Sequence, residues 1–181
     1  METSDQARIQ RGESIRVTED RKVIDLYRDG TMIFATMADS NFLAWGHKGS
    51  VKINPLALIE VVYSFVSLYQ RVLNDFRSPP ESIAFRIELR NMHLDGVKNY
   101  LLPGALMSTS QQFEMDARQA PDDNWKWSKS FHSAEFDVAA ISYDLVREVY
   151  LWFGHEESAI PYSKEVNGIK MISPDAIAKN G

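Results

Sequence analysis

One long segment, residues 55–76, dominates the pattern of hydrophobic and polar positions along the chain. Only three polar residues interrupt the apolar and aromatic run of residues 56–69, namely Glu60, Ser64 and Ser67. Asn54 suits a helix N-cap, and Pro55 suits the first helical position because no amide hydrogen bond is needed there. The pattern therefore predicts a helix over residues 55–76. A helix without a wide polar face must be buried on most sides, so we expect the rest of the chain to wrap around it.

Alternation of apolar and polar residues predicts strands before and after this helix. Residues 83–90 alternate in this way, with one apolar face formed by Ile83, Phe85, Ile87 and Leu89. The dipeptide Asp29-Gly30 lies between two β-prone runs and predicts a hairpin with a type I′ turn, in which both central residues need positive φ. Further strands are expected at residues 14–18, 42–45, 97–102, 113–118, 125–131 and 169–172.

A second helix is predicted over residues 137–153. Apolar residues recur there at steps of three and four positions, and Gly154 stands where a left-handed C-cap is expected. Hairpin signals and one-sided alternation in the strands favour an α+β fold. We expect mainly antiparallel sheets packed around the long apolar helix and this second, amphipathic helix.

The length of 181 residues suits a single α+β domain over residues 1–181. Within it, residues 1–13 are polar and expected to be frayed. The repeated order of strands and then a helix suggests two similar halves, residues 14–78 and 82–154. Hydrophobic residues make up 44% of the chain, which is ample for a folded core.

Composition excludes several kinds of chemistry. The chain has no cysteine, so disulfides, thiolate catalysis and cysteine-ligated metal sites are excluded. Its net charge of −5 lacks the positive field typical of nucleic-acid-binding proteins, which disfavours a nucleic-acid partner. Residues 1–13 lack a signal-peptide core, and the long apolar run is too short for a membrane span and contains Glu60. We therefore expect a soluble, cytoplasmic protein.

No sequence motif identifies a reaction, a metal or a cofactor. The chain has no glycine-rich phosphate loop, no Walker lysine motif and no GxSxG nucleophile elbow. The histidines do not form HxH or HxxxH pairs, so we predict neither a metal site nor a cofactor. They occupy expected turns or strand ends, where we expect them to be exposed, and they are His47, His93, His132 and His155.

Glu60 is the strongest candidate for acid–base chemistry. A carboxylate on a mostly apolar helix must be paired, protonated or facing a cavity, and burial can raise a carboxyl pKa. The same position suits an internal ion pair or a narrow wet strip near the N-terminus of the helix, and we favour this structural role. In an enzyme, we expect Glu60 to act with a loop histidine, for which His93 and His132 are the candidates.

Two groups of residues are candidates for binding. Arg86 and Arg90 share a strand face with Glu88, where cross-strand ion pairing is the simpler explanation. Trp125 and Trp127 could present an aromatic platform beside neighbouring lysines. Because the two tryptophans are two positions apart in a predicted strand, they share a face, which fits core burial better.

Two stretches carry a resemblance to a known group of proteins. They are NPLALIE at residues 54–60, leading into the long helix, and VREVYLWFG at residues 146–154, followed by IPY at residues 160–162. These stretches resemble the C-terminal region of bacterial proteins, classed as DNA- or ATP-binding, that carry a Schlafen/AlbA-like domain at the N-terminus. The resemblance covers residues 12–177. The module to which DNA or ATP binding is attributed is not part of this sequence, so the resemblance implies no catalytic residue here.

Three classes of function follow from these observations. We predict a non-catalytic accessory, sensor or protein-interaction domain that works through a protein partner, a second copy of itself or a small ligand. The alternative is a hydrolase- or transferase-type enzyme, which requires Glu60 and a histidine to lie within hydrogen-bonding reach. The third is a nucleic-acid-binding accessory module, which predicts binding that weakens steeply with salt.

Overall fold

The computed structural model describes residues 7–9, 14–19, 22–37, 43–45, 52–94, 97–101 and 117–180. Its helices and mostly antiparallel sheets confirm the predicted α+β class, and the long apolar helix is present. The chain divides into two compact units, an N-terminal unit, Met1–Ala38, and a C-terminal unit, Asp39–Gly181.

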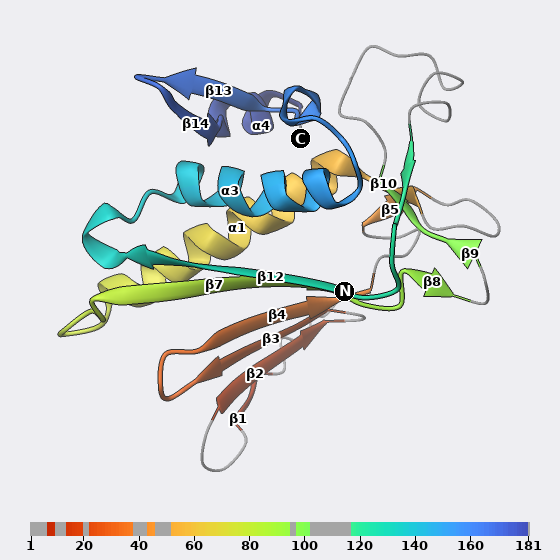
Figure 1. Ribbon diagram of the computed structural model, residues 1–181. Helices are drawn as coiled ribbons and strands as arrows, with labels where there is room; N and C mark the ends of the chain where they lie inside the picture. The colour runs from red at the N-terminus through yellow and green to blue at the C-terminus, as the bar shows by residue number, and fades with distance from the viewer. Residues whose placement is uncertain are drawn as a thin grey trace. The chain divides into compact units, whose positions relative to one another are not determined.

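The N-terminal unit holds an antiparallel sheet with the strand order β1-β2-β3-β4 (Figure 1). Part of the polar residues 1–13 forms the first strand, which pairs with the second. The strands are β1 (Ala7–Ile9), β2 (Ser14–Glu19), β3 (Lys22–Tyr27) and β4 (Met32–Thr36).

The predicted hairpin at Asp29-Gly30 is present, but the predicted type I′ turn is wrong. Gly30 has a φ of 86°, whereas Asp29 does not have a positive φ. The Gly30 amide donates to the Tyr27 carbonyl at 3.1 Å, and the Tyr27 amide donates to the Thr31 carbonyl at 2.8 Å. The Asp29 carboxylate accepts from the Thr31 amide at 2.8 Å, a local bond that favours this turn. The loop is therefore three residues long, with glycine alone in the left-handed region.

Strand register gathers apolar side chains on one face of this sheet. Ile15 lies opposite Leu26, and Val17 lies opposite Ile24. No apolar side chain described between residues 14 and 37 is buried, and Ile15 and Val17 are 47% and 41% exposed. The described part of the N-terminal unit is therefore a sheet without a closed core.

The C-terminal unit is built around two helices and a long two-stranded ribbon (Figure 1). The ribbon pairs β7 (Ser82–Leu89) with β12 (Trp125–His132) in antiparallel register. Helices α1 (Pro55–Asn74) and α3 (Val138–Trp152) pack against each other on one side of it. The predicted strand over residues 125–131 and the predicted second helix are both confirmed.

A C-terminal hairpin lies on the far side of α3 from the ribbon (Figure 1). It consists of β13 (Ser163–Val166) and β14 (Ile169–Ile172), and α4 (Pro174–Asn180) follows it. The other elements are short. Four two-residue strands form a sheet in the order β11 (Arg118–Gln119), β10 (Tyr100–Leu101), β6 (Lys52–Ile53) and β5 (Ala44–Trp45). A separate pair consists of β8 (His93–Leu94) and β9 (Val97–Lys98), and the two 3-10 helices are η1 (Ser133–Glu135) and η2 (Glu157–Ala159).

Helix α1 begins as predicted but is less buried than predicted. The Asn54 side chain accepts from the Leu56 amide at 2.9 Å, and Pro55 occupies the first turn. The fully buried positions form one stripe that includes Ile59 and Val66, while Leu68 is 37% exposed. Most of the other positions are half-buried, so α1 is enclosed less completely than expected. By length and composition alone, α1 could also cross a membrane, with a hydropathy of 1.4.

Helix α3 has a cap at each end, of which the sequence pattern predicted the C-terminal one. The Asp137 side chain accepts from the Ala139 and Ala140 amides at 2.8 and 3.0 Å. At the other end Gly154 has a φ of 80°, and the His155 amide donates to the Tyr150 carbonyl at 2.9 Å. This bond, with the one from Gly154 to Leu151, is the Schellman motif that the glycine predicts.

The C-terminal hairpin contains a turn that the pattern analysis overlooked. Asn167 and Gly168 both have positive φ, 52° and 79°, and link β13 to β14 through a two-residue loop. Asn-Gly is the preferred sequence for a type I′ turn, so the signal was present in the sequence. The strand predicted over residues 113–118 lies mostly outside the described residues.

Candidate functional site

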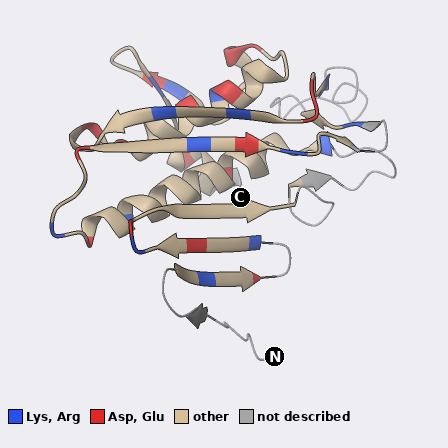
Figure 2. Ribbon diagram, turned by 60° about the horizontal axis from the view of Figure 1, so that its bottom comes forward, with Lys and Arg blue, Asp and Glu red and all other residues tan. Residues whose placement is uncertain are grey.

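The even-numbered residues of β7 and β12 form the exposed face of the ribbon, which includes Arg86, and Arg90 follows directly after β7. Figure 2 shows the basic and acidic residues along the two strands. Arg86 Nη2 lies 2.6 Å from one Glu88 carboxylate oxygen, and Arg90 Nε lies 2.7 Å from the other. These bonds, above all the one from Arg90, hold the pKa of Glu88 below its usual range. Lys126 lies opposite Glu88 on β12. The face is exposed, and its ion pairs join neighbouring residues along one segment of the chain, whereas we expected them to cross between strands. It holds more basic than acidic side chains.

Trp125 and Trp127 lie on the opposite, helix-facing side of the same ribbon. Trp125 is in register with Leu89, and its ring stacks on Trp152 of α3 with 5.6 Å between centroids. Trp127 is in register with Ile87, two residues further along the same face. The candidate arginines and tryptophans therefore belong to two different surfaces.

Glu60 lines a hollow of about 350 Å³ between α1 and α4. Tyr63 and Ser64 line it from α1, and Ile177 and Ala178 line it from α4. Glu60 is half-buried, and no hydrogen bond or ion pair joins its carboxylate to another described residue. Of the two structural roles that we favoured for Glu60, the internal ion pair is therefore not formed within the described chain, which leaves the narrow wet strip near the N-terminus of the helix.

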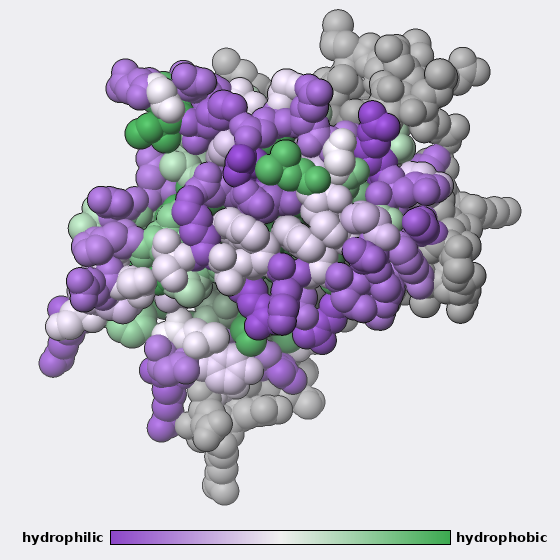
Figure 3. All heavy atoms as spheres, in the orientation of Figure 1, coloured by the Kyte–Doolittle hydropathy of each residue, from purple (hydrophilic) through white to green (hydrophobic). Residues whose placement is uncertain are grey.

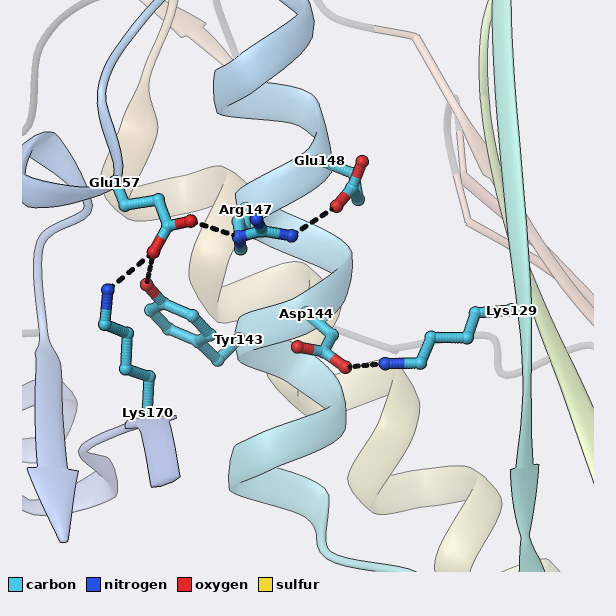
Figure 4. Close-up of polar contacts among 7 residues, drawn as sticks. All are labelled: Lys129, Tyr143, Asp144, Arg147, Glu148, Glu157 and Lys170. Atoms are coloured by element: carbon cyan, nitrogen blue, oxygen red, sulfur yellow. Dashed lines mark hydrogen bonds and ion pairs between the residues drawn. The ribbon is translucent and has the colours of Figure 1, made fainter. Parts of the chain in front are cut away.

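His132 lines a different hollow, of about 310 Å³, between β12 and the first turns of α3. Its Nδ1 accepts a hydrogen bond from the Ala134 amide at 3.2 Å and so caps η1. In the same hollow, Lys129 Nζ lies 2.6 Å from the Asp144 carboxylate (Figure 4). This ion pair ties the ribbon to α3, and His132 itself is exposed, as predicted.

Two other histidines are less exposed than predicted because they bind backbone carbonyl groups. His93 is half-buried, with Nε2 3.0 Å from the Ala120 carbonyl. His155 is only 8% exposed, with Nε2 3.0 Å from the Leu101 carbonyl. The Schellman turn that ends α3 directs His155 back onto the helix, where its ring lies 5.6 Å from that of Tyr150. The remaining histidine, at position 47, lies outside the described residues.

Glu60 and the described histidines do not come together. Glu60 and His132 line separate hollows, while His93 and His155 engage backbone carbonyls from other elements. Nor do three or more His, Asp or Glu side chains gather to hold a metal ion in the part of the chain that was searched. The geometry that the enzyme alternative requires does not occur among these residues.

The most extensive polar cluster centres on Glu157 of η2 (Figure 4). Its carboxylate accepts from Arg147 Nε at 2.5 Å, from Lys170 Nζ at 2.6 Å and from the Tyr143 hydroxyl at 3.2 Å. The bonds from Lys170 and Arg147 lower the pKa of Glu157 to about 2. Arg147 also donates to Glu148 at 2.7 Å. Because every charge has a partner, the cluster serves as a tie between α3, η2 and β14.

Sequence reasoning missed this cluster. No local pattern singles out Glu157, because its partners Arg147 and Lys170 lie ten or more positions away. One signal was available: Tyr143 and Arg147 are four residues apart on a predicted helix and therefore share a face. Nothing in the local pattern indicates that Lys170 meets the same carboxylate.

Comparison with known proteins gives no match to any family model, any curated protein or any solved structure.

Proposed function

We propose that this chain is a non-catalytic interaction domain that pairs with a second copy of itself through the edge of its N-terminal sheet. One observation carries the proposal: β4 ends its sheet, bears no charged residue and is accompanied by exposed apolar side chains. The sequence resemblance to the C-terminal region of Schlafen/AlbA-like proteins agrees with an accessory role.

Strand β4 differs from every other strand of four or more residues in the described ranges. Each of the others contains at least one Lys, Arg, Asp or Glu, whereas β4 reads MIFAT. Natural edge strands carry such charges because they hinder pairing with another chain. Ile33 in β4 is 44% exposed, and Met37 directly after the strand is 61% exposed. β4 therefore lacks the usual protection of an edge strand.

A second copy of the chain is the occupant that best suits this edge. Antiparallel pairing of β4 with β4 of another copy about a two-fold axis sets no like charges opposite one another, because the strand has none. The pairing joins the two sheets into one. It also extends the apolar face that holds Ile15 and Val17, which a single chain leaves 47% and 41% exposed.

On the face drawn in Figure 3, hydrophilic residues cover most of the described surface, and strongly hydrophobic residues form small separate patches. Isolated apolar side chains are normal on protein surfaces and need no partner. The uncharged strand at the sheet edge therefore favours pairing, whereas exposed apolar residues in general do not.

The substitution Ile33→Lys tests the proposal against a matched variant, Val166→Lys. The two residues are both in strands and have similar exposed fractions, 44% and 42%, but Val166 lies in the C-terminal hairpin. We expect the wild-type chain and Val166→Lys to sediment as dimers. Ile33→Lys should sediment as a monomer, because lysine on an edge strand hinders pairing.

Circular dichroism spectra of the three proteins control for unfolding. A wild-type chain that stays monomeric even at high concentration contradicts the proposal. So does a dimer that persists in Ile33→Lys.

A further inference from the structure

Glu60 differs from the other buried or half-buried acidic residues of the described chain in its lack of a hydrogen-bonding partner. Each of the others that is buried or half-buried has a hydrogen-bonding partner, and these are Asp25, Asp123, Asp144, Glu148 and Glu157. Glu60 is half-buried and has none among the residues that the structure describes. A carboxylate that lines a hollow and has no donor in the described chain can accept hydrogen bonds from a cationic donor outside it.

The hollow beside Glu60 has polar groups on one wall and apolar groups on the other. Glu60, Tyr63 and Ser64 stand three and four positions apart, so they share one face of α1. Their oxygen atoms can all accept hydrogen bonds. Ile177 and Ala178 of α4 form the apolar wall. The volume of about 350 Å³ lies within the range of small-ligand sites.

The surroundings of the hollow are electronegative. Burial raises the pKa of Tyr63, and the negative charges of Asp137 and Asp175 raise it further. Burial likewise raises the pKa of Tyr162, with a second contribution from the charge of Glu60. The Tyr162 hydroxyl is buried and has no hydrogen-bonding partner. None of the described residues that line the hollow is a lysine or an arginine.

We propose that this hollow binds an alkylammonium or guanidinium group. The group has N–H donors for the Glu60 carboxylate and the Ser64 hydroxyl, and the methylene stem behind it can pack on Ile177 and Ala178. A divalent metal ion fits less well, since Ca²⁺ takes six to eight oxygen ligands and the hollow offers a single carboxylate. The cation can come from a free amine or from a lysine or arginine side chain of a partner. The proposal does not depend on pairing through β4.

Titration with n-butylammonium chloride, followed by two-dimensional NMR of the isotope-labelled chain, tests the site directly. We expect saturable shifts confined to the amides of α1 and α4 around Tyr63, Ser64 and Ile177. Butylguanidinium should give the same pattern. n-Butanol, which has the same stem without the charge, and sodium chloride at equal ionic strength should give no saturable shift.

Two substitutions identify the group responsible. Glu60→Gln keeps the shape of the side chain but removes its charge, and we expect it to weaken binding at least about tenfold, which corresponds to about 1.4 kcal/mol. Ser64→Lys places an ammonium group four residues after Glu60, a spacing that favours an ion pair on a helix. This built-in cation should abolish amine binding. Glu81→Gln, at an exposed position, serves as the matched control and should bind as the wild type does.

The source of the cation is settled by comparing free amines with peptides. A lysine-containing peptide that binds at least about tenfold more tightly than n-butylammonium indicates a partner side chain, whereas equal affinity indicates a free amine. In either case the hollow is a cation site. Absence of saturable shifts in the wild-type chain, or equal binding by Glu60→Gln, overturns the proposal.

Discussion

The two units of this chain place apolar side chains in different surroundings. In the C-terminal unit, helices α1 and α3 pack together and against the ribbon, and Ile59, Val66 and Val149 are fully buried. In the N-terminal unit, strands with equally regular alternation leave Ile15 and Val17 nearly half exposed. Alternation brings apolar residues to one face of a sheet, but only a second layer buries them. The C-terminal unit contains that layer in its own helices, and we infer that the N-terminal sheet needs a partner.

The largest difference between the units should appear on truncation of a core side chain. Phe85 is 4% exposed, and its ring contacts Tyr69, Phe131 and Phe136. We expect Phe85→Ala to lower the free energy of unfolding by about 3–5 kcal/mol. Ile15→Ala in the N-terminal sheet should change it by less than about 1 kcal/mol. Urea unfolding followed by tryptophan fluorescence measures the loss for Phe85→Ala.

All four tryptophans lie after residue 38, so their fluorescence reports the C-terminal unit. Unfolding of the N-terminal sheet needs a separate measurement, such as hydrogen exchange of the β3 amides. The two variants could instead lower the free energy of unfolding equally, Phe85→Ala in the C-terminal unit and Ile15→Ala in the N-terminal unit. That result would show that the N-terminal sheet has a core of its own and would contradict the difference between the units.

A smaller loss of stability is expected on substitution of the glycine that ends α3. Gly154 has a φ of 80°, and an added Cβ atom would meet no other atom within 4 Å. Gly154→Ala should therefore lower the stability of the C-terminal unit through backbone strain alone, by about 1–2 kcal/mol. Gly154→Asn should cost less, because asparagine tolerates the left-handed region better. Equal unfolding midpoints for all three proteins would be inconsistent with the capping role of this residue.

Low pH should lower the stability of the two units by breaking a different ion pair in each. Lys170 and Arg147 lower the pKa of Glu157 from an ordinary value of 4.5 to about 2, and Arg16 lowers that of Asp25. A lowered folded-state pKa stabilises the fold above the ordinary value, and that stabilisation is lost as the pH falls through the folded value. For Glu157 the window therefore runs from about pH 4.5 down to about pH 2.

The matched variants Glu157→Gln and Asp25→Asn separate these two contributions. We expect Glu157→Gln to remove the acid dependence of the amide protection factors in β14 while leaving those in β3 unchanged. Asp25→Asn should remove the acid dependence of the protection factors in β3 while leaving those in β14 unchanged. An acid dependence in β14 that is the same in Glu157→Gln would show that other carboxylates hold the hairpin to α3.

Local features of the fold were predictable from the sequence, and contacts between distant segments were not. The cap at Asn54, the alternation in β7 and the glycine after α3 each depend on a few adjacent residues, and all are confirmed. The burial of His155 and the convergence of Lys170 and Arg147 on one carboxylate depend on how α3 and the hairpin pack. No periodicity within one segment contains that information.

In the candidate site too, features that depend on adjacent residues were predictable, and contacts between distant segments were not. That Glu60 could face a cavity followed from its place on an apolar helix, but its missing partner and the wall provided by α4 did not. Likewise, the alternation in β12 put Trp125 and Trp127 on one face. Only the register with β7 shows that this face is opposite to that of the arginines.

Hydrogen exchange of the β2, β3 and β4 amides at low and high protein concentration tests the central claim most directly. If a second copy completes the N-terminal sheet, mass action should increase protection in these strands as the concentration rises, while protection in α1 and α3 stays constant. Protection in the N-terminal strands that is as strong as in α3 and independent of concentration would contradict the account.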